Sequence, residues 1–509
     1  MHNYFLRLLT LLLAGVLGAC STTQKTPQQT NTGRTAKREF RGAWIQTAFQ
    51  GEYKEMTPAQ MRQSFIKKLN FLQACGINAI IFQVRPEADA FYKSDIEPWS
   101  RFYTGVQGKA PAGNFDPMAF LIEECHKRNM EFHAWLNPYR ISTAGNTRFA
   151  DSHIYHRHPE WFVTYNKQIL FDPGLPDSRK FICKVVKDIV TRYDVDAIHM
   201  DDYFYPYPAA GMPFPDDRSF YKYGLRKGYT EAQRADWRRE NVNKLIQEIK
   251  RTILLTKPWV RFGISPFGIY RNKKSTPDGS GSQTNGLQNY DDLYADVTHW
   301  VKQGWIDYNI PQIYWEIGHP AADYITLIKW WNKQAGNRHL YIGQDVARTM
   351  KADQLTRKMR YERALSQIDG NCFWPANEIL WNNQGIADSL KHHYHRYPAL
   401  IPAYTFMHDR APKEVSGLKT QWTERGFELR WKAKQSPTNP ELANYFVIYR
   451  FKDKEPINLN DPAKIVATTR NCYYLLPYDK GQRKYRYVVT AVDRFHNESV
   501  KGKNKKVKL

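Results

Sequence analysis

The chain has 509 residues, more than one small hydrophobic core requires, so two domains, or one large domain and one small, are expected. Its 74 lysines and arginines outnumber its 50 aspartates and glutamates, and the formal charge of +24 favours an anionic partner such as an acidic glycan or an anionic membrane surface. Nucleic-acid binding is not predicted, because the sequence has no zinc-finger spacing, no RNP-like motif and no basic block beyond the tail 501–508.

The N-terminus predicts export and lipid attachment. Residues 1–20 (MHNYFLRLLTLLLAGVLGAC) hold an apolar run that is too short to span a bilayer and suits a cleaved signal peptide. Residues 17–20 (LGAC) resemble the bacterial lipobox, which implies that Cys20 is lipidated; an ordinary signal peptide with an incidental cysteine is the alternative. We therefore expect a signal peptide over 1–20, a flexible tether over 21–37, and a protein anchored by its lipid in the bacterial cell envelope, with Ser21 favouring the outer membrane, facing the periplasm.

From Phe40 to about Tyr394, short β-like runs alternate with amphipathic helical runs. In the first helical run Thr57 can cap, Pro58 suits the first turn and Gly76 suits the C-terminus. Eight strand candidates start at Phe40, Asn78, Glu131, Ala197, Arg261, Asp307, Leu340 and Asn371. The alternation predicts a (β/α)₈ TIM-type barrel over residues 38–400 with its active site at the carboxyl ends of the strands. A doubly wound sheet is disfavoured, because no glycine-rich phosphate turn follows the first strand.

After Pro402 the pattern changes to short strands with alternating polar and apolar residues. Four such runs, including GFELRWKA and NYFVIYRF, predict a small two-sheet β-sandwich over 410–509. This part resembles a fibronectin type III module, which implies a spacing or docking role, and we assign it no chemistry.

Cysteine and histidine usage indicates neither a metal nor a cofactor. Five cysteines follow Cys20, an odd number without a CxxC motif, and those in helical patterns are expected to be buried hydrophobes. His392, His393 and His395 lie on the last predicted helix without a frame of carboxylates, so we expect a solvated helix face.

Polar and aromatic side chains gather at the carboxyl ends of the predicted strands. The stretch DAIHMDDYFYP (196–206) starts like a buried strand and ends in Asp201 and Asp202, which raise each other's pKa as adjacent acids. The other strand-end candidates are Arg85, Glu87, Asn137, Tyr139, Arg140, Tyr203, Arg271, Gln312, Tyr314, Glu316, Asp345 and Trp374. Ordinary rim ion pairs, Glu87 with Arg85 and Asp345 with Arg348, are the alternative explanation of the charged members.

Glycoside hydrolysis needs such a set of residues. One carboxylic acid protonates the leaving oxygen, a second carboxylate attacks the anomeric carbon or activates water, and aromatic faces support the sugar. Because side chains alternate along a strand, Asp201 and Asp202 cannot both point into the barrel unless the strand has already ended. We expect one of them to address the substrate and the other to orient it or brace a loop. Glu316, at the end of the sixth strand, is the expected distant catalytic partner, and the remaining candidates are assigned to substrate binding.

Five motifs between Arg38 and Tyr394 resemble the glycosyl-hydrolase-like family 10 domain of bacterial envelope lipoproteins. In chain order they are REFRGAWIQT, NAIIFQVRPEADAFYKSDIEPWS, FHAWLNPYR, AIHMDDYFYP and PQIYWE. The resemblance implies kinship with α-amylase-type and other barrel glycosidases. It also implies a substrate, the glycan strands of peptidoglycan after removal of their stem peptides.

Two related patterns leave the mechanism open. In family 18 chitinases the fourth strand carries D-x-x-D-x-D-x-E, and aligning Asp196 with its first position puts Tyr203 where the catalytic Glu would stand. Acetamido-assisted catalysis is therefore not expected, and direct attack or inversion is preferred. In the amylase-like scheme a fifth-strand Glu is the acid, but the fifth strand here (SPFGIYR) has none, so Glu316 is chosen by elimination.

The implied substrate fits the positive charge. A stripped strand exposes the lactyl carboxylate of each muramic acid, and arginines at the barrel mouth could bind these carboxylates through two parallel hydrogen bonds. The candidates are Arg85, Arg140, Arg271 and Arg348. The alternative is that they neutralise the barrel's own acids. Two loops, from Tyr203 and from Thr276, could line the cleft or be plain surface loops.

Two other functions stay open. One is a non-catalytic glycan-binding lipoprotein that anchors the envelope to the wall through a degenerate barrel. The other is a hydrolase of a different acidic polysaccharide, dietary or capsular. The sequence does not indicate an oligomeric state.

Overall fold

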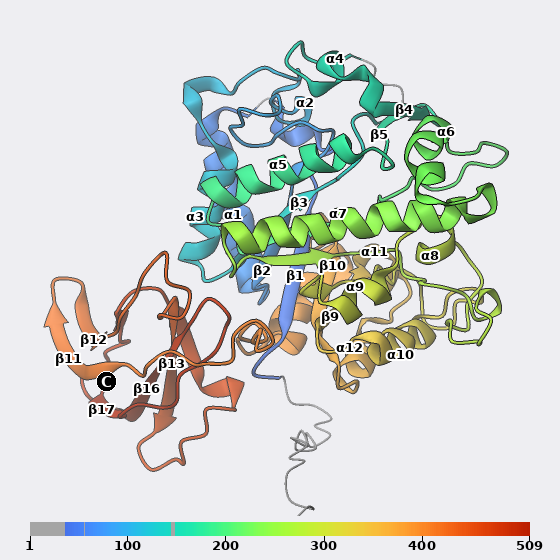
Figure 1. Cartoon of the computed structure of the whole chain (residues 1–509). Helices are drawn as coiled ribbons and strands as arrows, with labels where there is room; N and C mark the ends of the chain where they lie inside the picture. Colours follow the sequence, from blue (N-terminus) through green and yellow to red (C-terminus); the bar gives the residue numbers. More distant parts are fainter. Residues whose placement is uncertain (1–35, 55, 144–147) are drawn as a thin grey trace, which may run out of the picture. The chain divides into compact units, whose positions relative to one another are not determined.

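Eight parallel strands close into a barrel in the computed structural model, which describes residues 36–54, 56–143 and 148–509 (Figure 1). Around the barrel they are β1 (Phe40–Ile45), β2 (Ala79–Arg85), β3 (Glu131–Leu136), β6 (Ala197–Met200), β7 (Arg261–Ile264), β8 (Tyr308–Asn309), β9 (His339–Asp345) and β10 (Ile368–Trp374). All eight predicted strands are present. Pairing of β10 with β1 closes the ring and excludes the doubly wound sheet. The expected lipidation site Cys20 and the signal peptide lie outside the described residues.

The helices between the strands begin and end as their sequences indicate. In α1 (Pro58–Ala74) the Thr57 side chain accepts a hydrogen bond from the Gln60 N–H, and the Gln60 side chain accepts one from the Thr57 N–H. Gly76 has a φ of +76°, which favours glycine after a helix end. Every third or fourth residue of α1, from Met61 to Leu72, is buried against the barrel.

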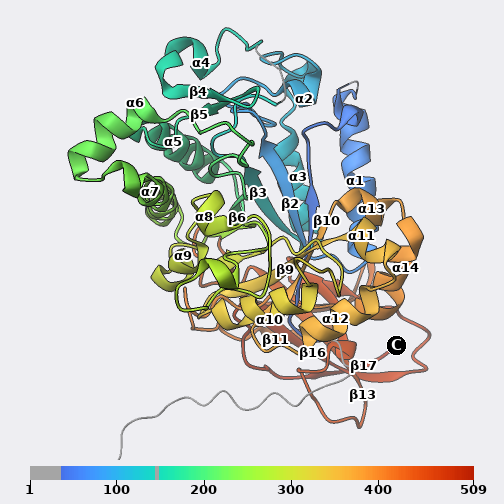
Figure 2. The same cartoon turned by 90° about the vertical axis from the view of Figure 1, so that its right-hand side faces the viewer.

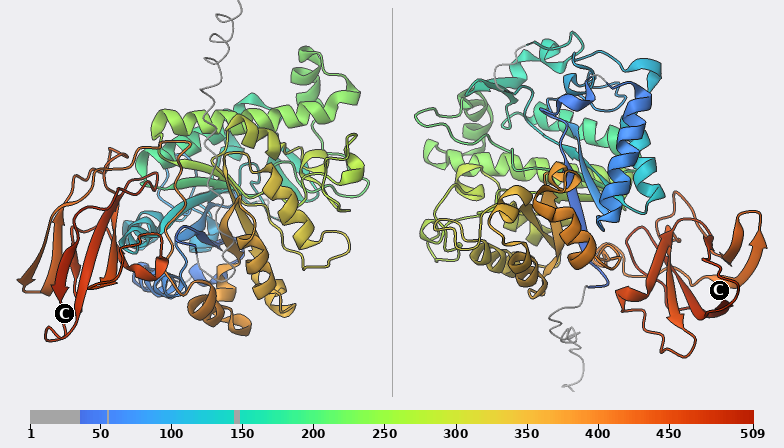
Figure 3. Two further views of the ribbon diagram at one scale, coloured as in Figure 1. Left: turned by 90° about the horizontal axis from the view of Figure 1, so that it is seen from below. Right: turned by 180° about the vertical axis from the view of Figure 1, so that it is seen from behind.

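The other helices follow the strands in turn and enclose the barrel from all sides (Figures 2 and 3). The longer ones are α3 (Pro117–Lys127), α5 (Pro176–Arg192), α7 (Arg234–Thr256), α9 (Val297–Gln303), α10 (Tyr324–Gln334) and α12 (Leu355–Arg363). The shorter ones are α2 (Arg101–Thr104), α4 (Ile154–Arg157), α6 (Asp217–Ser219), α8 (Asn289–Asp292), α11 (Val346–Lys351), α13 (Ala376–Leu380) and α14 (Ile386–Ser389). A two-stranded hairpin, β4 (Phe162–Tyr165) and β5 (Gln168–Phe171), lies between β3 and α5.

Aromatic rings and glycines fill the barrel interior. Phe40, Trp44, Trp135, Tyr308 and Tyr341 form one buried cluster there. The space for Tyr308 exists because residue 263 is glycine: a Cβ at that position would lie 1.9 Å from the Tyr308 ring. Small residues on one strand therefore make room for large rings on the next, as close packing requires.

A continuous hydrogen-bonded column crosses this interior. The Tyr308 hydroxyl lies 2.8 Å from His133 Nδ1 and 3.1 Å from His199 Nδ1. His133 Nε2 contacts the Glu131 carboxylate at 2.9 Å, at the amino end of β3. His199 Nε2 lies 2.9 Å from the Ser265 hydroxyl, just past the carboxyl end of β7. Every polar group in this column therefore has a hydrogen-bond partner, as buried polar groups require.

The C-terminal part forms two antiparallel sheets, as predicted for a sandwich. One sheet has the order β11 (Ser416–Thr423), β12 (Gly426–Lys432), β15 (Tyr473–Leu475), and the other β14 (Ile465–Thr469), β13 (Tyr445–Lys452), β16 (Lys484–Val492), β17 (Lys505–Lys508). Its assignment to the fibronectin type III type stays a prediction. His496 from this part reaches Glu131 Oε1 at 2.6 Å, and Arg494 forms an ion pair with Asp194 at 2.9 Å. These contacts attach the sandwich to the amino ends of the barrel strands.

The structure also bears on the cysteines, the histidines and membrane spanning. All five cysteines of the described part of the chain are unpaired, and Cys75, Cys125 and Cys372 are buried. The expectation of a solvated histidine face is wrong for His395, which is buried and hydrogen-bonded to the Cys75 carbonyl, whereas His392 and His393 are exposed. Among residues 36–54, 56–143 and 148–509, no helix combines the length and apolar character needed to cross a bilayer.

Candidate active site

Two adjacent carboxylates stand just beyond the carboxyl end of β6. The strand ends at Met200, and the chain bends at Asp202. The alternation of strand side chains therefore stops before the pair, which is the condition under which both carboxylates can face the barrel mouth. Both residues are only 4% exposed.

Each carboxylate is held by hydrogen-bond donors from neighbouring strand ends. Asp201 accepts from Trp135 Nε1 at 3.0 Å and from Asn137 Nδ2 at 3.4 Å, both at the end of β3. Asp202 accepts from Gln312 Nε2 at 3.1 Å and from the Tyr207 hydroxyl. Gln312 also donates to the Ser265 carbonyl at 2.8 Å, which fixes its amide. Asp202 is thus hydrogen-bonded to the loop that follows it, through Tyr207.

Burial makes both members of the pair weaker acids than isolated aspartates. It raises the pKa of Asp201 to about 7, with the neighbouring charge of Asp202 as the next cause. Burial also raises the pKa of Asp202, against the hydrogen bonds from Tyr207 and Gln312. Arg140 opposes the rise in both groups. Because the two groups interact, the proton belongs to the pair, which therefore holds one proton at a pH where two isolated aspartates would hold none.

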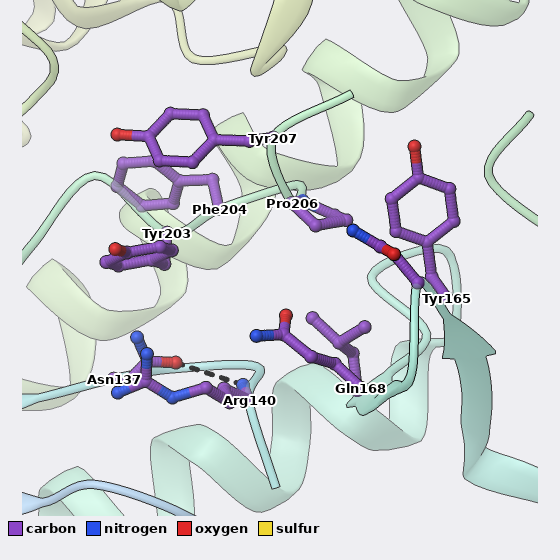
Figure 4. Close-up of a pocket in the computed structure, with 10 residues that line it drawn as sticks. Asn137, Arg140, Tyr165, Gln168, Tyr203, Phe204, Pro206 and Tyr207 are labelled. Carbon is purple, nitrogen blue, oxygen red and sulfur yellow. Dashed lines mark hydrogen bonds between the residues drawn. The ribbon is translucent and has the colours of Figure 1, made fainter. Parts of the chain in front are cut away.

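A pocket of about 230 Å³ opens beside the pair (Figure 4). Neither carboxylate lines it directly, but three of its lining residues, Asn137, Tyr203 and Tyr207, contact the pair. Tyr165 and Gln168 of the β4–β5 hairpin form the opposite side, as Figure 4 shows. The loop from Tyr203 lines this pocket, the first of the two alternatives for that segment.

Among the four arginines considered for the mouth, only Arg140 is without an acidic partner in the described part of the chain. Arg85 binds Glu97, Arg271 binds Asp291, and Arg348 lies 3.7 Å from Asp345. The Arg140 guanidinium lies 5.2 Å from the centre of the Tyr203 ring, on the pocket wall, and its Nε donates to the Pro86 carbonyl. Three of the arginines thus form ion pairs with the protein's own acids. Arg140 lowers the pKa of Asp201 and Asp202 without such a pair, and it is the cation available to a ligand.

The remaining candidate acids are Asp345, which ends β9, and Glu316. Glu316 was expected at the end of the sixth strand, but β8 ends at Asn309, so Glu316 lies in the loop that follows. Tyr314 is half-buried, and burial raises its pKa, followed by the charge of Asp202 and, less strongly, that of Asp345. Asp345 caps α11 by accepting from the Arg348 N–H at 2.8 Å, and burial raises its pKa. Glu316 is half-buried. Burial lowers the pKa of the Lys358 ammonium, and the charges of Glu362, Glu316 and Asp345 oppose that fall. No hydrogen bond or ion pair joins Glu316 to Asp201 or Asp202 among the described residues.

Trp374 belongs to the aromatic floor of the site. Its ring meets the Trp135 ring edge-on at 6.0 Å between centroids, and Trp135 donates to Asp201. The structure therefore brings Trp374 close to the pair, along with Asn137, Arg140, Tyr203 and Gln312.

Three candidates lie in the protein interior instead. The guanidinium of Arg85 is occupied by Glu97 and by the Asn137 and Pro138 carbonyls. Glu87 accepts from Arg101 and from the Thr143 N–H. The Tyr139 side chain is fully buried in the main core. The suggested Glu87–Arg85 pair is wrong, since each has a different partner, whereas the Asp345–Arg348 pair is present.

Sequence reasoning missed three contributors to the site. Trp135 lies two residues before Asn137, so the two-residue period of a strand could have placed its indole beside the pair. Tyr207 belongs to the aromatic loop that was noted as possible cleft lining. Tyr165 of the hairpin offered no signal, because nothing in a four-residue strand indicates which cleft it will border.

Comparison with known proteins shows the family to which the chain belongs. Residues 39–359 match the family described as Glycosyl hydrolase-like 10. Glycosyl hydrolase YngK of Bacillus subtilis (strain 168) is 40% identical over 486 residues, covering 92% of this chain and 93% of that protein. Glycosyl hydrolase DigH of Escherichia coli (strain K12) is 37% identical over 334 residues, covering 61% of this chain and 74% of that protein.

Similarity to solved structures is weaker. The PgaB (BpsB) glycoside hydrolase domain from Bordetella bronchiseptica aligns with a TM-score of 0.47 and 10% identity, covering 69% of this chain and 98% of that one. No functional argument follows from a likeness of that size.

Proposed function

Since the chain belongs to the glycosyl hydrolase-like 10 family, we propose that it hydrolyses O-glycosidic bonds of an acidic envelope glycan, with peptide-stripped peptidoglycan strands as its substrate. The observation that supports this most is the buried pair Asp201–Asp202, two adjacent carboxylates with raised pKa values beside an aromatic pocket. A carboxyl group that stays protonated near neutral pH is what protonation of a glycosidic oxygen requires.

In the proposed reaction the pair supplies the proton. Its protonated member gives the proton to the glycosidic oxygen while the bond from that oxygen to the anomeric carbon breaks. The ionised member stabilises the positive charge that develops on the sugar ring. The donors Trp135 and Gln312 fix the two carboxylates in position without titrating themselves.

Glu316 remains our proposed second carboxylate, which attacks the anomeric carbon or activates water. Asp345 is the alternative, because it ends the barrel strand β9 and burial raises its pKa. Separate Glu316→Gln and Asp345→Asn variants decide between them. The variant that lacks the catalytic carboxylate should lose several orders of magnitude in kcat, and the other should keep most of its turnover.

The proposed acidic substrate rests on Arg140 and on the charge of +24. Arg140 lines the pocket and forms no ion pair among the described residues. Its Nε donates to the Pro86 carbonyl, so its two terminal nitrogens are the donors left for a carboxylate on the sugar. We also propose that a lipid on Cys20 holds the enzyme in the envelope, where such strands are found. Recovery of a Cys20→Ser variant in the membrane fraction at the wild-type level would contradict the anchor.

Release of reducing ends tests the function. Purified full-length protein is incubated with peptide-free glycan strands and, separately, with intact peptidoglycan. We expect new reducing ends from the stripped strands and few from the intact wall. Binding to the strands without any release would identify a non-catalytic glycan-binding protein, and release only from an unrelated acidic polysaccharide would replace the substrate.

A further inference from the structure

A second ligand-sized groove lies on the outside of the barrel between α1 and α13. The two helices follow β1 and β10, which are neighbours where the barrel closes, and they lie side by side in Figure 2. The groove has a volume of about 880 Å³, within the range of roughly 300–1,000 Å³ that ligand sites occupy.

One end of the groove lies at the same face of the barrel as the carboxylate pair. Gln50, in the loop after β1, and Asn377, in the first turn of α13, meet there, with Asn377 Nδ2 donating to Gln50 Oε1 at 3.2 Å. Asn377 is three residues beyond Trp374 on the floor of the site. The groove therefore begins at the face of the barrel that carries the active site.

The walls of the groove carry exposed aromatic rings. Trp381, just after α13, is 69% exposed, and Phe71 on α1 is 38% exposed. Trp381 has no ring–ring contact within residues 36–54, 56–143 and 148–509. Exposing a tryptophan forgoes the stabilisation that burying it would give, and an exposed aromatic ring beside a groove is typical of a binding surface.

The polar lining fits a sugar chain. Four side-chain amides, from Gln50, Gln63, Asn70 and Asn377, line the groove. Each amide offers both donors and an acceptor, as sugar hydroxyl and acetamido groups require. Charge is sparse: Lys68 is paired with Glu52, and Lys67 is exposed without a partner in the described part of the chain.

We propose that this groove is an accessory binding site for the glycan chain, in which Trp381 stacks on a sugar ring, the amides bind its hydroxyl and acetamido groups, and Lys67 binds a carboxylate. The site retains a strand whose neighbouring residues occupy the active site. The inference rests on the proposed glycan substrate and extends it from a single cleavage point to a length of chain.

Binding and cleavage of long and short chains test the groove. Binding is measured by titrating peptide-free strands into the full-length Asp202→Asn protein and into the Asp202→Asn/Trp381→Ala double variant. Cleavage is measured with the Trp381→Ala single variant on a short soluble oligosaccharide and on long strands. We expect binding of long strands to weaken roughly fivefold to tenfold, since one stacked ring is lost. Turnover of the short oligosaccharide stays unchanged, because it does not reach the groove.

Trp422→Ala is the matched control. Trp422 is 60% exposed and lies on β11 of the sandwich, in contact with Phe427 and Tyr478. We expect it to leave strand binding unchanged. Wild-type affinity in the Trp381→Ala protein overturns the proposal, and loss of binding in the Trp422→Ala protein alone moves the accessory site to the sandwich.

Lys67→Ala separates charge from stacking. It should weaken binding of the acidic strands about threefold and leave binding of a neutral chitooligosaccharide as it is. Equal losses for both ligands would overturn the role of Lys67. If no strand is cleaved by the wild-type protein but Trp381→Ala still loses binding, the proposed hydrolysis fails and the groove stands.

Discussion

Asp201 and Asp202 lie where the charge of a neighbouring residue strongly affects their pKa. Both are nearly inaccessible to water, each raises the other's cost of ionisation, and Arg140 is the cation that offsets it. Activity that needs one proton on the pair should therefore fall as the pH rises through the pKa of about 7.

In Arg140→Ala, this fall in activity should occur at higher pH. Removing a nearby positive charge raises the pKa of an acid, so we expect a shift of roughly half to one pH unit toward higher pH. The pH dependence of kcat/KM on a neutral oligosaccharide measures it. Lys127→Ala is the control, because Lys127 lies at the end of α3 in an exposed ion pair with Glu123. A fall at the wild-type pH in Arg140→Ala would show that the titrating group is elsewhere.

The pair should also cost stability at alkaline pH. Its pKa in the folded protein is raised above the unfolded value, so its favourable contribution is complete below about pH 4 and is lost as the pH rises through about 7. At pH 8 we expect Asp202→Asn to unfold at a higher temperature than wild type, by the equivalent of about 1–3 kcal/mol. Thermal unfolding at pH 5 should show a smaller difference. The same gain at both pH values would contradict the charge repulsion.

At the scale of elements, the amino ends of β3 and β7 hold the barrel to the sandwich. Glu131 starts β3 and accepts hydrogen bonds from His133, from His496 of the sandwich and from Arg261 of β7. Although burial alone would raise the pKa of the Glu131 carboxyl, Arg261 and His496 hold it well below its usual range. The carboxylate therefore stays ionised in the interior.

Glu131→Gln should destabilise the whole protein. It leaves the buried Arg261 guanidinium without a counter-charge, which costs about 3–5 kcal/mol. Glu123→Gln is the control, since its ion pair with Lys127 is exposed and contributes less than about 1 kcal/mol. Chemical denaturation compares the two. Equal midpoints would show that the Glu131 cluster does not stabilise the fold.

The elements themselves could be predicted from the sequence because their signals are local. Thr57, Pro58 and Gly76 mark the ends of α1, and the eight apolar runs mark the strands. The adjacent acids after β6 could also be located, since a polar pair ending a buried run is visible in the sequence alone.

The partners of charged side chains could not be predicted in the same way. Arg85 binds Glu97, which lies in a loop, and Arg271 binds Asp291, which lies in the short helix α8, so neither acid is at a strand end. Glu131 and His496 are 365 residues apart in sequence. Tyr139 turns into the core because the chain bends at Pro138 after β3 ends, and strand periodicity no longer applies there. Sequence patterns report which face a residue takes within an element, but not which distant group meets it.

At the scale of the molecule, the charge of +24 should steer acidic glycan toward the enzyme. The initial rate on peptide-free strands at low substrate should fall severalfold between 50 mM and 300 mM salt, because the screening length shortens to less than about 10 Å. The rate on a neutral chitooligosaccharide of matched length should change little. An equal fall for both substrates would show that salt acts on the enzyme and not on the encounter.

The central claim is that the Asp201–Asp202 pair carries out glycosidic bond cleavage. The most direct test is single-turnover release of reducing ends from peptide-free strands by Asp201→Asn and Asp202→Asn, with Glu123→Gln as control and strand binding measured in parallel. We predict that each aspartate variant loses at least about a thousandfold in rate while its affinity for the strands stays within about threefold of wild type, and that the control retains full activity. Near-wild-type turnover in both aspartate variants would contradict the account.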